Sequence, residues 1–419
     1  MGPSAVAIFL GAPLVIRSHD TPYPFRQDSD FWYLTGFDHP SAAAVLRTDG
    51  GPDYTLYVEP RDPATEIWTG YRPGTEGALR DYGADEAFPQ DQLLEHVPEL
   101  VGKVERIYHV LGRNLRIDAT ITDTIEALHR RSRQGVEPPE AIIDPRGIVH
   151  EMRLIKEPAE LDVMRRAAAI SAEAHSEAAR LAHGGAYEYE LEAVIEYTIR
   201  RLGARGVAYT TIVGGGPNAT VLHYITNDQK LRDEQLVLID AGCELEGYAS
   251  DVTRTYPVGG RFSGPGRALY EVVLAAQEAA FEACRPGEAL PGVHDAATRK
   301  LVEGLVDLGL LSGDVDELIA EEKHKAFYMH NTRHWLGLDV HDVGAYKVGG
   351  EDRALEPGMV FTVEPGVYVA ESNEQADLRF RGIGVRIEDD VAITADGHEN
   401  LSAAIPKAPD ELEALVSDR

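Results

Sequence analysis

A twice-repeated order of segments in the later part of the chain constrains its fold most. The first round comprises helical patterns over about 158–181 and 191–202 and then strand-like runs at 208–213, 236–241 and 248–258. The second round comprises helical patterns at about 266–284 and 293–311 and then strand-like runs at 359–364 and 383–393. Two helices followed by strands, twice over, predict an internally duplicated α+β domain.

A separate, smaller domain is predicted before this region. Its strand-like runs at 42–46 and 54–58 are divided by a Gly-Gly-Pro turn, and helical stretches follow them. The segment 136–140 reads as a connector because it carries two consecutive prolines. We therefore predict two domains, residues 1–149 and 150–419, as expected for a chain too long for one core.

Charge and composition exclude several classes of function. The net charge is −30, from 70 acidic and 40 basic residues, and such a field repels nucleic acid. No apolar run is long enough to span a membrane, and the first ten residues lack the basic stretch of a signal peptide. Cys243 and Cys284 are too few for a disulfide framework. We predict a cytoplasmic protein with buried free thiols that binds neither nucleic acid nor membranes.

Carboxylates interrupt apolar strands in the first half of the duplicated region. Asp240 ends the run Leu236–Ile239, and Asp251 stands near the start of the next run. A hairpin with Leu245 and Glu246 at its tip would place Asp240 directly opposite Asp251 on one face. A lone Asp is more simply a turn residue. Two facing carboxylates beside a buried run would repel each other unless a cation or a shared proton lies between them.

The second half repeats this anomaly beside a cluster of histidines. Glu364 ends an apolar run, and Glu388 follows Ile387 in another. Between the first acidic pair and this second one lie His330, His334 and His341, each of which alone would more simply be a satisfied core or surface residue. The spacing of His330 and His334 resembles a zinc-protease helix, but the required Glu after the first His is absent and the pattern reads as extended chain.

One imidazole and four carboxylates form the predicted ligand set, which comprises Asp240, Asp251, His334, Glu364 and Glu388. Such an oxygen-rich set suits Mn²⁺, Co²⁺ or Mg²⁺, with Zn²⁺ possible. Four negative charges balance two divalent ions, so the hypothesis is a two-metal site in which a bridging hydroxide attacks a carbonyl polarised by one metal.

At these residues the sequence closely resembles the bacterial Xaa-Pro aminopeptidases (aminopeptidase P), metallopeptidases of the M24 "pita-bread" family. The similarity covers nearly the whole chain. It is carried by YPFRQDSDFWYLTGF at 23–37, LHY at 222–224, VLIDAGCELEGYASDVTRTYPV at 237–258, HWLGLDVHDVG at 334–344, EPGMVFTVEPGVY at 356–368 and RGIGVRIEDD at 381–390.

The resemblance implies a fold, cofactors and partners. The fold would be a pseudo-twofold pita-bread catalytic domain with a smaller N-terminal α/β domain of ribonuclease-H-like architecture. The five residues above would bind two metal ions, usually Mn²⁺, and the substrates would be peptides with proline in second position. The protein would form a homo-oligomer, a dimer or tetramer, in which Trp68 reaches a neighbouring subunit's active site.

The same resemblance implies roles for further residues. His223, His330 and His341 would line the substrate pocket with Arg386 beside them. We predict Glu364 as a proton shuttle, His341 or His223 as a donor to the developing oxyanion, and His330, His341 and Tyr368 as the proline pocket. Tyr368 could equally be a packed strand-end residue, and Arg386 could be a partner of the carboxylates rather than a substrate anchor.

The chain departs from its relatives next to His334. Relatives usually have Gly-Leu-Ser where this chain has Asn331-Thr332-Arg333, so a long cation stands next to His334 and puts substrate preference in question. Prolidase, which cleaves only Xaa-Pro dipeptides, is the nearest alternative activity. A non-catalytic binding protein on the same fold is the other, although the complete ligand set argues against it.

Overall fold

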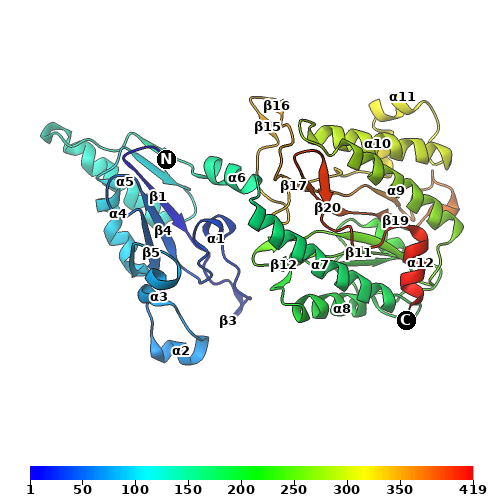
Figure 1. The fold of residues 1–419 in the computed structure, drawn as a ribbon, viewed down its shortest axis with the longest axis horizontal. Helices are drawn as coiled ribbons and strands as arrows, with labels where there is room; N and C mark the ends of the chain where they lie inside the picture. The colour runs from blue at the N-terminus through cyan, green and yellow to red at the C-terminus, as the bar shows by residue number, and fades with distance from the viewer. Residues whose placement is uncertain (419) are drawn as a thin grey trace. The chain divides into compact units, whose positions relative to one another are not determined.

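The structure is a computed structural model that describes residues 1–418, and the chain divides into two compact units, Met1–His150 and the residues from Glu151 onward. Their helices and strands are labelled in Figure 1.

The first unit is built on a six-stranded sheet with the strand order β6-β5-β4-β1-β7-β8. The strands are β1 (Ala5–Leu10), β4 (Ala43–Arg47), β5 (Tyr54–Val58), β6 (Glu86–Pro89), β7 (Arg106–His109) and β8 (Ala141–Ile143). Only the pairs β1–β4 and β4–β5 are antiparallel. A small hairpin, β2 (Ile16–Ser18) with β3 (Thr21–Pro22), stands apart from this sheet. The predicted strands at 42–46 and 54–58 are confirmed.

Helices cover both faces of this sheet. Alternate residues of β1 point to opposite faces, and both sets are apolar, so each face has apolar surface to bury. Ala5, Ala7 and Phe9 join one apolar cluster, whereas Val6 and Ile8 join another that includes residues of α4 and α5. The helices of this unit are α1 (Ser29–Thr35), α2 (Pro63–Thr69), α3 (Gly74–Asp81), α4 (Leu93–Val101) and α5 (Leu115–Arg130). Helix α6 (Arg146–Leu154) contains the boundary between the units.

The first half of the second unit begins with two packed helices, α7 (Pro158–Leu181) and α8 (Glu188–Arg201). Pro158 takes the first position of α7, and the Glu160 carboxylate accepts from the N–H of Glu157 at 2.7 Å. The strands that follow are β9 (Gly206–Val207), β10 (Ile212–Gly215), β11 (Leu236–Asp240), β12 (Cys243–Leu245), β13 (Tyr248–Ala249) and β14 (Thr253–Pro257).

The second half repeats this order with the packed helices α9 (Gly264–Ala283) and α10 (Leu290–Asp307). Figure 1 shows the two helix pairs on opposite sides of the strands of this unit in that view. The remaining elements are α11 (Val315–Ala320), β15 (Lys347–Val348), β16 (Glu351–Asp352), β17 (Val360–Val363), β18 (Gly366–Val369), β19 (Ile383–Arg386), β20 (Asp389–Ile393), β21 (His398–Asn400) and α12 (Pro409–Ser417). The predicted order of two helices and then strands, twice over, is confirmed.

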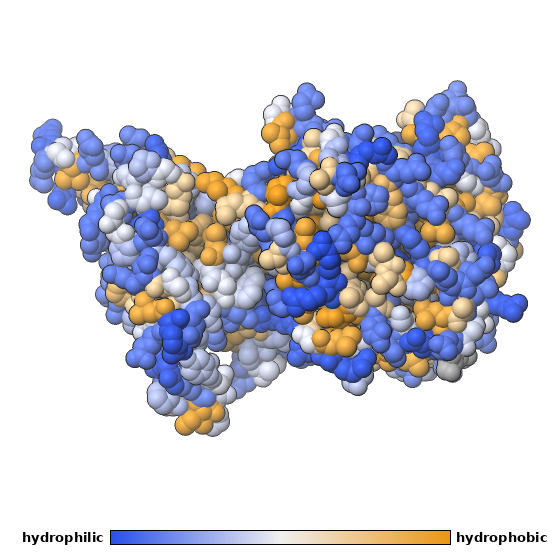
Figure 2. Space-filling view, viewed as in Figure 1, coloured by the Kyte–Doolittle hydropathy of each residue, from blue (hydrophilic) through white to orange (hydrophobic). Residues whose placement is uncertain are grey.

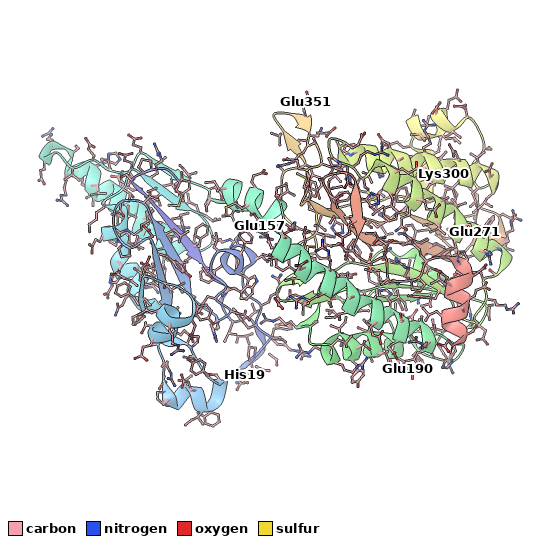
Figure 3. The ribbon with its side chains drawn as sticks, viewed as in Figure 1. His19, Glu157, Glu190, Glu271, Lys300 and Glu351 are labelled. Atoms are coloured by element: carbon pink, nitrogen blue, oxygen red, sulfur yellow. The ribbon has the colours of Figure 1, made fainter. Side chains whose placement is uncertain are left out.

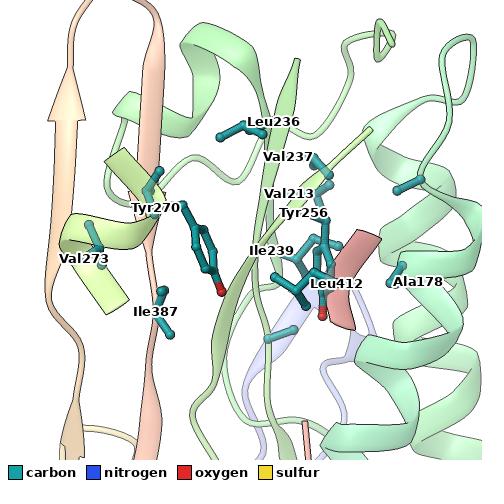
Figure 4. Packing of buried hydrophobic residues seen from close by; sticks show 14 of the residues in the cluster. Ala178, Val213, Leu236, Val237, Ile239, Tyr256, Tyr270, Val273, Ile387 and Leu412 are labelled. Carbon is teal, nitrogen blue, oxygen red and sulfur yellow. The ribbon is translucent and has the colours of Figure 1, made fainter. Parts of the chain in front are cut away.

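A shared apolar core holds the two halves together. Val237 and Ile239 of β11 pack in one cluster with Tyr270 and Val273 of α9 and with Ile387. Figure 4 shows these side chains lying between the strands and the helices. Because both halves bury residues in this cluster, the strand ends that carry the acidic residues are fixed relative to one another.

The excess of acidic residues lies mainly on the outside. Glu190 and Glu271 are exposed on α8 and α9, and Figure 3 labels them on these helices. Figure 2 shows the corresponding mostly hydrophilic surface. Both cysteines are buried and free, as predicted. Within residues 1–418, no helix has both the length and the apolar content needed to cross a bilayer.

Candidate metal centre

A cavity of about 490 Å³ in the second unit brings most of the predicted site residues together. All five predicted ligands line it, namely Asp240, Asp251, His334, Glu364 and Glu388. Four further predicted residues also line it, namely His223, His330, His341 and Arg386. A larger cavity of about 660 Å³ lies in the first unit, but its lining holds no histidine and none of the predicted site residues.

The first acidic pair is carried by β11 and by the chain between β13 and β14, but its predicted register is wrong. Asp240 pairs with Thr253, and Leu245 pairs with Tyr248, so Glu246 and Gly247 form the tip. Both tip residues have positive φ, 50° and 87°, as a tight two-residue hairpin turn requires. The turn therefore sets the register two residues away from the predicted one, and Asp251 does not face Asp240.

The second acidic pair does have the facing geometry. Val363 pairs with Asp389 on one side of it, and Gly366 pairs with Arg386 on the other. The same register carried between these pairs sets Glu364 opposite Glu388. Both residues lie between the β17–β20 pair, which belongs to a three-stranded sheet, and the two-stranded β18–β19 sheet, so their side chains are presented at a break between the sheets.

His334 reaches these carboxylates from an extended segment. Its backbone N–H donates to the Thr362 hydroxyl at 3.1 Å, and its carbonyl accepts from the N–H of Thr362 at 3.0 Å. Its Nδ1 lies 3.0 Å from the carbonyl oxygen of Trp335, which turns Nε2 toward Asp251 Oδ2 at 3.3 Å and Glu364 Oε1 at 3.7 Å. The segment is not helical, which confirms that His330 and His334 do not form a zinc-protease helix.

Three of these side chains are spaced for a metal ion. One ligand atom each from Asp251, His334 and Glu388 lies within 4.8 Å of the others. Burial raises the pKa of Glu364 to about 7 and holds the pKa of Glu388 well above its usual range, and neighbouring carboxylates add to the Glu388 shift. Burial alone would lower the pKa of His334, but Asp251 and Glu364 raise it to about 9. The cluster thus attracts positive charge, and its donors fit a hard divalent cation.

Asp240 is held differently from the other carboxylates. Its Oδ1 accepts from the Tyr209 hydroxyl at 2.6 Å, and its Oδ2 accepts from Arg386 Nη2 at 2.5 Å. Arg386 is buried and also donates to the Tyr368 hydroxyl at 3.0 Å and to the Thr253 hydroxyl at 3.1 Å. Arg386 is therefore engaged as a partner of the carboxylates.

The predicted proline-pocket residues separate into two groups. His330 and His341 line the cavity, whereas Tyr368 does not and is only 1% exposed. The Tyr368 hydroxyl lies 2.8 Å from His330 Nε2, so it supports His330 from behind. Burial, with the charge of Arg386, lowers the pKa of His330 to about 3. The rings of His341 and His334 are in contact, with centroids 4.3 Å apart.

Two supporting groups were not found from the sequence. Asp342, directly after His341, is buried and accepts from Arg153 at 2.5 Å and from Lys156 at 3.0 Å, which anchors the loop that carries His341. Thr253 donates its hydroxyl to Glu388 at 2.7 Å. Their signal in the sequence was the presence of polar residues inside apolar runs, which does not by itself distinguish a support from a ligand.

Trp68 belongs to the first unit, on α2, and is 87% exposed beside the 81% exposed Ile67. Figure 2 shows a hydrophobic tip at the place of α2 in the first unit. The role predicted for Trp68 concerns a neighbouring subunit, and it stays a prediction.

Residues 162–395 match metallopeptidase family M24, and residues 1–108 match the aminopeptidase P N-terminal domain. The chain belongs to metallopeptidase family M24. This M24 metallopeptidase is 46% identical over 420 residues to the Xaa-Pro aminopeptidase of Escherichia coli, covering 99% of this chain and 94% of that protein. It is 35% identical over 423 residues to mouse Xaa-Pro aminopeptidase 3, covering 99% of this chain and 81% of that protein.

Solved structures agree with this assignment to M24. Pseudomonas aeruginosa aminopeptidase PepP superposes with a TM-score of 0.96 at 48% identity, covering 100% of this chain and 95% of that one. A variant of E. coli aminopeptidase P in complex with substrate superposes at 0.95 with 46% identity and the same coverages. The predicted fold class, a pita-bread domain after a smaller N-terminal domain, is confirmed.

Proposed function

We propose that this M24 metallopeptidase is an Xaa-Pro aminopeptidase that uses two divalent metal ions. It would release the N-terminal residue from peptides with proline in second position. The observation that carries the proposal is the meeting of one imidazole and four carboxylates in a single cavity of a chain so similar to Xaa-Pro aminopeptidases. The two units would correspond to the N-terminal domain, 1–149, and the catalytic domain, 150–419.

We propose Asp240, Asp251, His334, Glu364 and Glu388 as the metal ligands. Their oxygen-rich composition favours Mn²⁺, with Co²⁺ or Zn²⁺ as alternatives, and a Zn-substituted form of the E. coli relative is known with product bound. When bound, the ions would lower the pKa of a water molecule and polarise the carbonyl of the scissile bond. Arg386 and Tyr209 would fix Asp240 in the orientation that binding requires.

The remaining steps belong to the side chains of the cavity. Glu364 would accept the proton of the attacking water, and His330 Nδ1 lies 3.5 Å from its Oε2. His341 and His223, at exposed positions on the cavity wall, would donate to the developing oxyanion and help to protonate the leaving amine. That protonation matters because proline leaves as a secondary amine.

Selectivity for proline would come from the shape of the cavity. The ring fixes φ, and the missing N–H defeats peptidases that hold an extended backbone. His330 and His341 would contact the ring, while Tyr368 and Arg386 act as positioning residues behind them.

Metal analysis combined with kinetics on Gly-Pro, Gly-Pro-Pro and longer Xaa-Pro peptides tests the proposal. An Xaa-Pro aminopeptidase should cleave Gly-Pro-Pro readily and bind two metal ions per chain. A strong preference for Gly-Pro would instead indicate a prolidase. No turnover of any of these peptides by the metal-loaded protein would favour a non-catalytic binding protein.

Three further predictions belong to this proposal. A homo-oligomer, dimer or tetramer, is expected in analytical ultracentrifugation. Trp68 would contribute to a neighbouring subunit's site, so Trp68→Ala should lower kcat/KM only if the protein is oligomeric. The cytoplasmic location is checked by fractionating cells that produce the protein.

A further inference from the structure

One arginine at the metal cavity has no carboxylate partner. Arg333 lines the cavity next to His334 and is half-buried. Its Nε donates to the carbonyl oxygen of Leu290 at 3.2 Å, and its guanidinium carbon lies 5.9 Å from the centre of the Tyr346 ring. Among residues 1–418, no carboxylate forms an ion pair with it, and Nη1 and Nη2 make no hydrogen bond.

The only other arginine in the described lining of this cavity is in the opposite situation. Arg386 is 4% exposed and binds the Asp240 carboxylate and two hydroxyl groups. Each of its three nitrogens already donates to the protein, so it has less capacity left for a ligand. Arg333 is therefore the arginine of the cavity wall with free hydrogen-bonding capacity.

An unpaired, half-buried guanidinium is unfavourable without a counter-ion, because its charge has lost part of its hydration. Here it stays unpaired in a chain with 70 acidic residues against 40 basic ones, where surface carboxylates are abundant. The planar guanidinium presents two parallel N–H groups that match the two oxygens of a carboxylate. The missing partner is therefore expected to come with the ligand.

The backbone that carries Arg333 is firmly fixed on both sides. The Thr332 hydroxyl lies 2.8 Å from His294 Nδ1 and 2.5 Å from the Tyr328 hydroxyl. His334 on the other side is bound through its backbone to Thr362. The backbone at Arg333 is thus ordered before a ligand binds, and the bond from Nε to Leu290 restrains the side chain.

We propose that Arg333 forms a carboxylate-binding subsite of the substrate cavity. Its ligand is a carboxylate of the peptide, either the free C-terminal carboxylate of a short Xaa-Pro-Yaa peptide or the side chain of an acidic residue. The inference rests on the proposed Xaa-Pro aminopeptidase function and adds to it a preference for carboxylate-bearing substrates.

Matched substrate pairs test the proposal on the metal-loaded enzyme. Ala-Pro-Ala is compared with its C-terminal amide, and Glu-Pro-Ala-amide with Gln-Pro-Ala-amide. The wild type should prefer the carboxylate member of at least one pair by about 10-fold in kcat/KM, the size expected for one hydrogen-bonded charge. The pair that shows the preference identifies the source of the carboxylate.

Variants assign that preference to Arg333. Arg333→Gln should remove it, and Arg333→Lys should keep part of it because the charge remains without the planar fork. Arg299→Gln is the matched control, since Arg299 is exposed on α10, pairs with Asp316 at 2.6 Å and changes the net charge equally. The control should keep the wild-type ratio.

Two results would overturn the proposal. One is equal cleavage of acid and amide by the wild type, which would leave the aminopeptidase function intact. The other is a preference that persists in Arg333→Gln. Failure of the wild type to cleave any of the four peptides would overturn the proposed function as well. Should Arg333→Gln fold poorly, product inhibition of the wild type decides: Pro-Ala is compared with Pro-Ala-amide, and Glu with Gln. Equal inhibition within both pairs contradicts the subsite.

Discussion

The two halves of the second unit deliver their acidic residues by different strand pairings. Both halves carry the pattern of an acidic residue, any residue and Gly, as Asp240-Ala241-Gly242 and Glu364-Pro365-Gly366. In the second half Glu364 lies opposite Glu388, whereas in the first half Gly242 lies opposite Asp251. The same short motif therefore supplies acidic residues to one cavity with a different strand register in each half. The two residues that directly face each other, Glu364 and Glu388, are the ones with the longer side chains.

The halves also differ in how they balance charge. Asp240 in the first half is paired with Arg386, which is supplied by the second half. Glu364 and Glu388 face each other, and burial raises the pKa of both. The carboxylate that adds most to both shifts is Asp251 of the first half, and burial raises the pKa of Asp240 as well. Repulsion in the metal-free protein therefore spans both halves, and the halves differ in that Asp240 is paired with an arginine.

The helices behind the strands show a third difference. His175 of α7 lies with its Nε2 3.0 Å from the carbonyl oxygen of Ala241 in the first half. Gln277 of α9 donates to the carbonyls of Val363 at 3.1 Å and Ile387 at 3.2 Å in the second half. The backbone carbonyls at the strand break are therefore contacted by an imidazole, which can titrate, in the first half. In the second half they are contacted by a side-chain amide, which cannot.

The largest expected effect tests whether both halves contribute to one site. Asp251→Asn and Glu388→Gln should each lower kcat/KM on Ala-Pro-Ala by more than about 100-fold, because direct ligands should matter more than their supporting residues. Bound metal should fall in parallel. Glu271→Gln, on the exposed face of α9, is the control. Full activity in either variant would contradict the two-metal proposal.

The register difference predicts unequal effects at the two glycines. A Cβ on Gly242 would lie 1.7 Å from the backbone oxygen of Ser250, whereas one on Gly366 would lie 2.5 Å from the Tyr368 hydroxyl. Gly242→Ala should therefore lower the free energy of unfolding by more than about 4 kcal/mol, and Gly366→Ala by clearly less.

Denaturant unfolding of the metal-free protein measures both glycine effects. Gly292→Ala in α10 is the control, because no atom lies within 4 Å of the added Cβ, and it should be neutral or slightly stabilising. Equal losses for Gly242→Ala and Gly366→Ala would mean that the two breaks are not packed as described.

The charge difference predicts stability changes of opposite sign in the metal-free protein. Asp240→Asn leaves buried Arg386 without its anion and should lower the free energy of unfolding by about 3 kcal/mol. Glu388→Gln removes repulsion and should raise it by about 1 kcal/mol. Calorimetry after metal removal measures both, and a change of the same sign in the two variants would contradict the asymmetry.

The smallest effect at neutral pH concerns acid stability. Burial lowers the pKa of His175 from 6.5 to about 4 in the folded protein, so the unfolded chain binds more protons between these values. Its contribution is fully present above pH 6.5 and is lost as pH falls toward 4, by up to about 3 kcal/mol. His175→Gln should flatten the pH dependence of unfolding in this window. An unchanged profile would exclude His175 as its source.

Much of the fold and the ligand types could be predicted from local pattern. The helical periodicity predicted α9 and α10, and the predicted ends lie within a few residues of the observed bounds, 264–283 and 290–307. Acidic residues inside apolar runs stood out because burying them is costly. The prediction that Asp240 lies opposite Asp251 was wrong, because the strand register depends on which two residues form the hairpin turn.

By itself, the sequence determined which residues alternate between core and solvent, where helices begin, and which polar side chains stand at buried positions. These properties follow from the chemistry of single residues and their near neighbours. The tertiary structure alone decided the register set by Glu246 and Gly247, the pairing of Asp240 with Arg386, and the isolation of the Arg333 guanidinium. Each of these depends on contacts between distant segments, and one residue of slip in a strand reverses the face that every side chain occupies.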